Sequence, residues 1–304
     1  MQINTVCGTI DINDLGNTLI HEHIICTSPE FSNEYTNWLP RQQVLDIACA
    51  KVRYAAEKHN IRTIIDGTPL SLGRNLELLQ EVSRATGVNI IASGGFYFYT
   101  SFAQRQLPTA TLARFMIEEI TQGPIKPAML KCAVDADGMT NDVKKMMNTV
   151  AEVQLATGLP VFMHSSSHKR NGLEALELFV QAGVDPRKIV VGHTADAGDA
   201  SYPVELLDKG CCVSIDRITP ANSEQRTGIL QAVLKSGDID RIFVTHDHIC
   251  CRDTIMNDPP AAQGEPNGLD TISTMVLPKL QGVAAGVDLA DKLLRENIIK
   301  LYQG

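Results

Sequence analysis

The chain has 304 residues, of which 44% are hydrophobic and 20% are charged, as in a folded globular protein with ample material for a core. Its formal net charge is −8 at pH 7, and a surface of that sign repels phosphate backbones. This charge disfavours a nucleic-acid partner.

The beginning of the chain lacks the basic region and the long apolar stretch of a signal peptide, and it reaches Asp11 and Asp14 early. No apolar run approaches the ~20 residues that cross a bilayer. The eight cysteines are scattered, some of them in adjacent pairs, which is a poor disulfide framework. We therefore expect reduced thiols, a cytoplasmic location and no membrane partner.

A short apolar run rich in β-branched residues, followed by a segment with helical spacing, recurs along the chain. These runs predict eight strands, at residues 18–20, 62–65, 89–92, 128–134, 160–163, 188–191, 211–215 and 241–244. Helical spacing is clear over 42–58, 141–157, 172–182, 222–234 and 271–280. Several of these segments end near a glycine, which commonly terminates a helix.

The alternation of buried strands and helices favours parallel pairing through crossover connections. Eight such units close a (β/α)8 TIM barrel, and we expect residues 1–304 to form it as a single domain. An open, doubly wound sheet is the structural alternative.

Six polar residues lie at or near the carboxyl ends of five predicted strands. The pair His21 and His23 is spaced so that both imidazoles point to the same side of a strand. The others follow or end later strands: Lys131, His164, His193 and Asp247. Because these strand ends converge on one face of a barrel, the six residues predict a site for zinc or a similar divalent ion.

Other roles are open for some of these residues. A lone histidine after an apolar run is often a core or rim residue, and His59, on the outer part of a helix, is interpreted in that way. An unmodified ammonium on Lys131 would be repelled by metal ions, so this lysine is either a catalytic or structural cation or a carbamate. A carbamate would be anionic and could bridge two ions.

The chain resembles the phosphotriesterase family in motifs that span nearly its whole length. The resemblance begins with residues 5–10 and 15–23 and continues through residues 129–131, 163–165, 184–193 and 245–247. It implies that His21, His23 and Asp247 hold a buried ion, that His164 and His193 hold a more exposed one, and that carboxylated Lys131 bridges them. A hydroxide shared by two divalent ions, Zn²⁺ or else Mn²⁺, Co²⁺ or Fe²⁺, would be the nucleophile, and Asp247 would take its proton.

Within that family, residues 95–99 and 214–217 are similar to those of phosphotriesterase-like lactonases. The resemblance implies that Tyr97 and Arg217 bind the substrate, although Tyr97 could be a rim aromatic and Arg217 could simply pair with Asp216. Thr219 departs from the lactonase pattern. Residues 249–251 lack the basic and tyrosine residues of relatives that act on phosphorylated lactones, and residues 253–268 form a polar loop expected to influence specificity.

We therefore expect a lactonase with weak phosphotriesterase activity that acts on a small-molecule substrate as a homodimer. One alternative is an amide or phosphoester hydrolase with the same metal centre, because the metals polarise any of these groups. Another is a catalytically silent metal-binding barrel. Asp247 argues against a silent barrel, because a purely structural zinc site closes its coordination shell and needs no open coordination position.

Overall fold

The computed structural model describes residues 1–35, 37–236, 238–253 and 268–304. Parallel strands in sequence order form its centre, each paired with the next. They are β3 (Asn17–Cys26), β4 (Ile61–Asp66), β5 (Asn89–Gly95), β6 (Met129–Ala133), β7 (Val161–His164), β8 (Ile189–Val191), β9 (Cys212–Ile215) and β10 (Ile242–Val244). Each of the predicted strands overlaps one of them.

The eighth barrel strand consists of two pieces, and the second piece closes the barrel by pairing with the first barrel strand. β10 pairs with β9, whereas β11 (Ile249–Arg252), which follows four residues later, pairs in parallel with β3. Across the seam, the Thr245 hydroxyl accepts the His21 backbone N–H at 3.2 Å and lies 2.9 Å from the His21 carbonyl oxygen. The chain is therefore a (β/α)8 barrel, and the open sheet is excluded.

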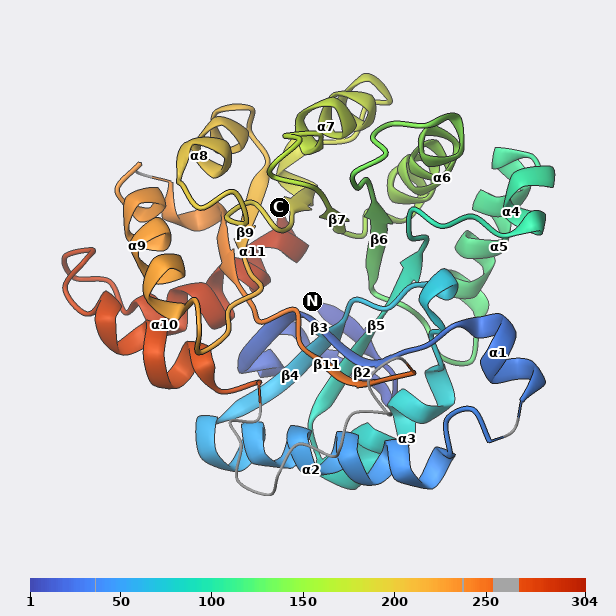
Figure 1. Cartoon of the computed structure of the whole chain (residues 1–304), viewed down its shortest axis with the longest axis horizontal. Helices are drawn as coiled ribbons and strands as arrows, with labels where there is room; N and C mark the ends of the chain where they lie inside the picture. Colours follow the sequence, from blue (N-terminus) through green and yellow to red (C-terminus); the bar gives the residue numbers. More distant parts are fainter. Residues whose placement is uncertain (36, 237, 254–267) are drawn as a thin grey trace.

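Helices follow the strands and surround them (Figure 1). The main ones are α2 (Arg41–His59), α3 (Leu76–Thr86), α5 (Thr109–Gln122), α6 (Asn141–Thr157), α7 (Gly172–Gln181), α8 (Ser201–Asp208) and α9 (Ser223–Leu234). After β11 come a π-helix (Ile272–Val276), a 3-10 helix (Leu277–Leu280), α10 (Leu289–Asp291), a second π-helix (Lys292–Glu296) and α11 (Asn297–Gln303). The predicted helix at 271–280 is thus wound partly as a π-helix and partly as a 3-10 helix, whereas the other four predicted helices are α-helical.

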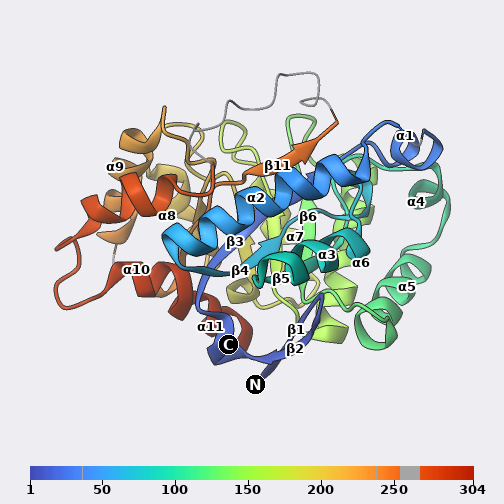
Figure 2. The same ribbon diagram turned by 90° about the horizontal axis from the view of Figure 1, so that it is seen from below.

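Several elements were not predicted from the sequence. The antiparallel strands β1 (Gln2–Thr5) and β2 (Gly8–Asp11) and a 3-10 turn (Ile12–Leu15) lie with both termini at the end of the barrel opposite β11 (Figure 2). Two short helices, α1 (Pro29–Glu34) and α4 (Phe102–Gln106), lie in the connections after β3 and β5.

The core has two layers because side chains alternate along each strand. One layer fills the barrel with a residue from each strand: Ile20, Ile65, Ile91, Met129, Phe162, Val190, Cys212 and Phe243. The neighbouring residues pack outward against the helices: Leu19, Ile64, Ile90, Leu130, Val161, Ile189, Val213 and Ile242. A packed interior confines polar chemistry to the strand ends.

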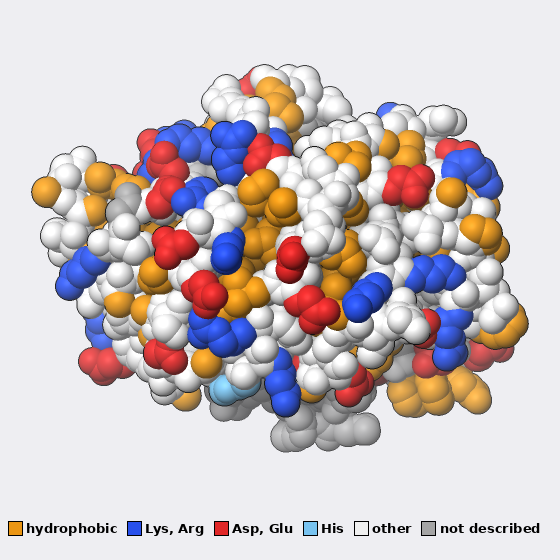
Figure 3. Space-filling view, turned by 90° about the horizontal axis from the view of Figure 1, so that it is seen from above, with side chains coloured by type: hydrophobic (Ala, Val, Ile, Leu, Met, Phe, Trp, Pro, Cys, Tyr) orange, Lys and Arg blue, Asp and Glu red, His pale blue; other side chains and the backbone are white. Residues whose placement is uncertain are grey.

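The face drawn in Figure 3 carries charges of both signs, and the cysteines form no disulfides. On the face in Figure 3, acidic and basic side chains are interspersed. All eight cysteines are free, as expected from their spacing. None of the helices in the described ranges has the length and apolar character needed to traverse a membrane.

Candidate metal centre

A β-bulge in β3 turns the two histidines of the His21–His23 pair into the barrel. Between the pairs Leu19–Ile64 and Glu22–Asp66, β3 has one residue more than β4. Side chains after this bulge therefore point to the opposite face of the sheet from the one that simple alternation would give. The His21 ring consequently stacks on Phe162 of the barrel interior at 4.0 Å. Gly67 leaves room for this ring, since a Cβ there would lie too close to His21.

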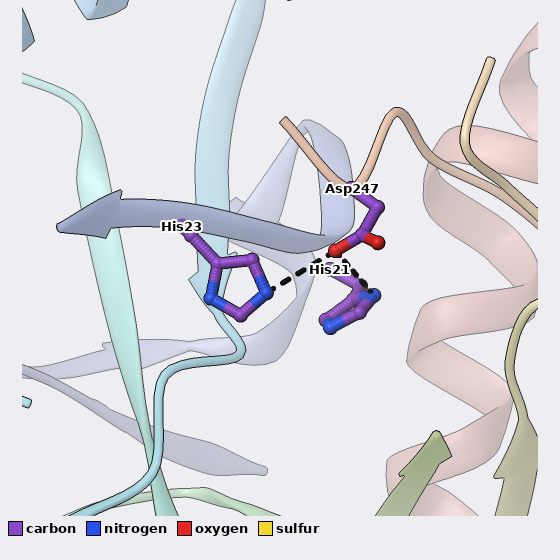
Figure 4. A group of neighbouring side chains, drawn as sticks. All are labelled: His21, His23 and Asp247. Carbon is purple, nitrogen blue, oxygen red and sulfur yellow. Dashed lines mark ion pairs between the residues drawn. The ribbon is translucent and has the colours of Figure 1, made fainter. Parts of the chain in front are cut away.

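Asp247 approaches both histidines from the break in the eighth strand (Figure 4). Its Oδ1 lies 3.2 Å from His23 Nε2 and 3.6 Å from His21 Nδ1. Asp247 has a positive φ of 55°, a conformation uncommon for a non-glycine residue, which directs its carboxylate to the centre of the site. Ligand atoms of these three residues lie within 4.8 Å of one another, as a shared cation requires.

The surroundings of His23 fix the tautomer of its neutral ring. His23 Nδ1 lies 2.7 Å from the Thr68 hydroxyl, which itself donates to the Ile25 carbonyl oxygen. Thr68 therefore accepts a proton from Nδ1, and Nε2 is unprotonated in the neutral ring. A lone pair and a carboxylate oxygen 3.2 Å apart repel each other, so a proton or a metal ion must lie between them.

His164, at the end of β7, and His193, just after β8, form a second histidine pair whose ring nitrogens face each other. His164 Nδ1 lies 2.8 Å from His193 Nε2. The outer nitrogens are held by carboxylates, His164 Nε2 by Asp135 at 3.0 Å and His193 Nδ1 by Asp216 at 3.0 Å. Burial lowers the pKa of His164 to about 3, so the ring is neutral. The inner nitrogens thus converge as two acceptors, an arrangement that suits a metal ion.

Lys131 lies on β6 between the two histidine pairs. Its ammonium nitrogen is 2.5 Å from His21 Nε2, and the residue is 1% exposed. Burial lowers the pKa of Lys131 to about 8 against the attraction of Asp247 and Asp216. At pH 7 a pKa of about 8 leaves roughly a tenth of the amine neutral, which is the form that reacts with CO2.

The structure thus brings all six predicted ligands together at the carboxyl ends of the strands. His193 Nδ1 lies 3.8 Å from Asp247 Oδ2, which links the two histidine pairs. His21 Nδ1 is buried with no hydrogen-bond partner among the described residues. Converging imidazoles with one carboxylate form a donor set that fits zinc or a similar ion.

Tyr97 lies at the edge of the centre, in the segment after β5. Gly95, with a φ of 113°, turns the chain there, and the Tyr97 backbone N–H donates to Ser71 at 2.8 Å. The Tyr97 hydroxyl lies 3.3 Å from His164 Nδ1. It can therefore reach a molecule placed against that side of the centre.

Arg217 does not pair with Asp216, in contrast to the alternative considered from the sequence. Its Nε donates to Asp247 Oδ2 at 3.1 Å and its Nη1 to Asp196 Oδ2 at 2.7 Å. Asp216 instead accepts the backbone and ring N–H groups of His193. Arg217 thus acts on Asp247 directly.

Sequence reasoning missed the residues that orient the ligands and Arg217. They are Glu22, Thr68, Asp135, Asp196 and, in this role, Asp216. The available signal was weak. Acidic residues just after predicted strands are common, and only the fold shows which side chain each one contacts.

A cavity of about 1120 Å³ opens over the centre. All of the candidate ligands except His193 lie in its wall, together with Tyr97 and Arg217. Its remaining wall is rich in apolar side chains: Leu70, Leu72, Phe96, Tyr99, Leu112, Phe115 and Met116. Such an apolar cavity with a few convergent polar groups is typical of small-molecule sites. Of the polar loop expected to influence specificity, residues 254–267 lie outside the described residues.

The sequence model of the phosphotriesterase family matches residues 1–302. The chain belongs to this family of metal-dependent hydrolases. It is 31% identical to an aryldialkylphosphatase of Saccharolobus solfataricus over 81% of each chain. It is 30% identical to a phosphotriesterase homology protein of Mycobacterium tuberculosis over 84% of this chain and 83% of that one. It is also 25% identical to an N-acetyltaurine hydrolase of Rattus norvegicus over 97% of this chain and 96% of that one.

Proposed function

We propose that this protein hydrolyses lactones at a centre of two divalent ions, with Zn²⁺ as the preferred metal. The observation that carries the proposal is the place of Tyr97. Its hydroxyl lies 3.3 Å from His164 Nδ1 and lines the cavity, so it can donate a hydrogen bond to the oxygen of a substrate held there. In the resemblance to the lactonases, this tyrosine faces the substrate.

The residues of the centre have distinct roles in this proposal. His21, His23 and Asp247 would hold one ion, and His164 and His193 the other, with Lys131 as a carbamate between them. Bound divalent ions would activate water and polarise the substrate carbonyl. Asp247, held by Arg217 through Oδ2, would accept the proton of the attacking water.

The apolar part of the cavity wall suits a neutral substrate. Its wall carries leucine and aromatic side chains, against which the hydrocarbon part of a lactone would pack. The guanidinium of Arg217, which contacts the centre, is already paired with Asp196 and Asp247. An anionic substrate would have to compete with those carboxylates for it.

Hydrolysis of a phosphotriester or an amide is the second candidate. The names of two relatives, an aryldialkylphosphatase and an N-acetyltaurine hydrolase, support it. Weak phosphotriesterase activity beside the lactonase activity is part of the proposal.

A substrate panel tests this proposal. The purified protein would be assayed with aliphatic lactones, a phosphotriester and N-acyl amino acids, each with and without a chelator. We expect the highest kcat/KM for a lactone, a lower value for the phosphotriester and loss of both activities with chelator. A higher kcat/KM for an N-acyl amino acid would replace the lactonase proposal with an amidase.

A further inference from the structure

The imidazoles of the centre differ in what lies behind them. His23 is backed by the neutral hydroxyl of Thr68 at 2.7 Å. His164 and His193, by contrast, are each backed by a carboxylate at 3.0 Å, Asp135 and Asp216 respectively. The carboxylates therefore gather behind one of the two histidine pairs.

Asp135 is held in place independently of His164. Its Oδ1 accepts the backbone N–H of Ala136 at 2.7 Å, which leaves Oδ2 to accept the N–H of His164. Its carbonyl oxygen accepts Asn171 Nδ2 at 2.8 Å, and Asn171 Oδ1 accepts the Ser166 N–H at 2.9 Å. Asn171 thus ties the loop after β6 to the loop after β7, and with it the carboxylate to the histidine.

The charge of Asp135 also has a consequence for the ion. In the proposed centre, His164 and His193 are neutral ligands, and the carboxylate of Asp247 lies with the other pair. Asp135 and Asp216 would supply negative charge to this position through the imidazole rings, which makes the inner nitrogens better donors. Asp216 also accepts the His193 backbone N–H, so replacing Asp216 would disturb the backbone as well as the ring. The Asp135 carboxylate, by contrast, binds the ring of His164 and not the His164 backbone.

We propose that Asp135 is a positioning residue that holds His164 in the tautomer with Nδ1 facing the metal centre, and that it thereby sets the affinity of the His164–His193 position for its ion. This inference rests on the proposed metal centre and not on the identity of the substrate. A failure of the lactone assay would leave it standing.

The test compares Asp135→Asn with Asp137→Asn. Asparagine keeps the size of the side chain but removes its charge. Asp137 is exposed two residues further along the same loop and serves as the matched control. Metal-free protein would be titrated with Zn²⁺ against a competing chelator to obtain the affinities of both binding steps. Circular dichroism would verify that each variant is folded.

We expect one binding step of Asp135→Asn to weaken about 10- to 100-fold while the other is unchanged, with both steps of Asp137→Asn unaltered. Nitrogen-15 NMR of the metal-free protein should show His164 protonated at Nε2 in the wild type and as a mixture of tautomers in Asp135→Asn. Wild-type affinity for both ions in Asp135→Asn would overturn the inference, as would an equal loss in Asp137→Asn. A wild-type protein that binds no metal would refute the centre and the inference together.

Discussion

The carboxylate of Glu22 holds the backbone on both sides of Asp247. Glu22 Oε1 accepts the backbone N–H of His246 at 2.9 Å, and Oε2 accepts that of His248 at 2.7 Å. The β3 bulge that turns His21 and His23 inward turns Glu22 toward the break in the eighth strand. One irregularity thus positions two candidate ligands and, through Glu22, a third.

Glu22→Gln should weaken both the fold and the reaction. A glutamine amide has a single acceptor oxygen, so its NH2 group would face a backbone N–H. We expect a loss of roughly 1–3 kcal/mol in the free energy of unfolding, measured by chemical denaturation. The value of kcat/KM should fall by about tenfold or more, because Asp247 is no longer fixed. Glu57→Gln, an exposed change on α2, is the control. Unchanged activity in Glu22→Gln would show that Asp247 needs no such support.

Loss of a candidate ligand should be far more damaging than loss of a histidine elsewhere. We expect His21→Ala, His164→Ala and Asp247→Ala each to reduce kcat/KM by about 100-fold or more, with lower metal content. His59→Ala should be nearly silent, since this residue ends α2 and its ring packs 5.5 Å from Tyr54. Equal damage from His59→Ala and His164→Ala would contradict the assignment of the site.

Lys131→Ala should lose metal and activity together. The amine is buried among the candidate ligands, and only as a carbamate would it be an anionic bridge. Short carboxylic acids should restore part of both by replacing the missing anion. Lys126→Ala, a change before β6, should alter neither. Electron density for an unmodified ammonium in the fully metal-loaded protein would refute the carbamate.

Tyr97→Phe separates the lactonase proposal from its alternatives. The variant loses one hydroxyl and little volume, so kcat/KM for a lactone should fall about 10- to 100-fold, or roughly 1–3 kcal/mol of transition-state stabilisation. The loss should be smaller for a phosphotriester, and metal content should be unchanged. Tyr54→Phe, on α2, 40% exposed and outside the cavity wall, is the control. Unaltered lactone kinetics in Tyr97→Phe would favour the amide or phosphoester alternative.

The barrel and the six candidate ligands could be predicted because they depend on local patterns. Buried strands give apolar runs, and ligands follow those runs at a fixed end of the fold. The β3 bulge could not be predicted, since it is a property of the pairing with β4 and not of β3 alone. Nor could β11, a short segment whose partner is the first strand of the barrel, more than two hundred residues away. The partners of Arg217 likewise depend on three separate strand ends.

The central claim is that hydrolysis depends on two ions held by these six residues. The most direct measurement is a titration of the metal-free protein with Zn²⁺ in the presence of bicarbonate, with lactone hydrolysis followed at each addition. Activity should be absent at the start, rise with added metal and level off at about two ions per chain. Full activity in the metal-free protein, or no activity at saturation with any divalent ion, would contradict the claim.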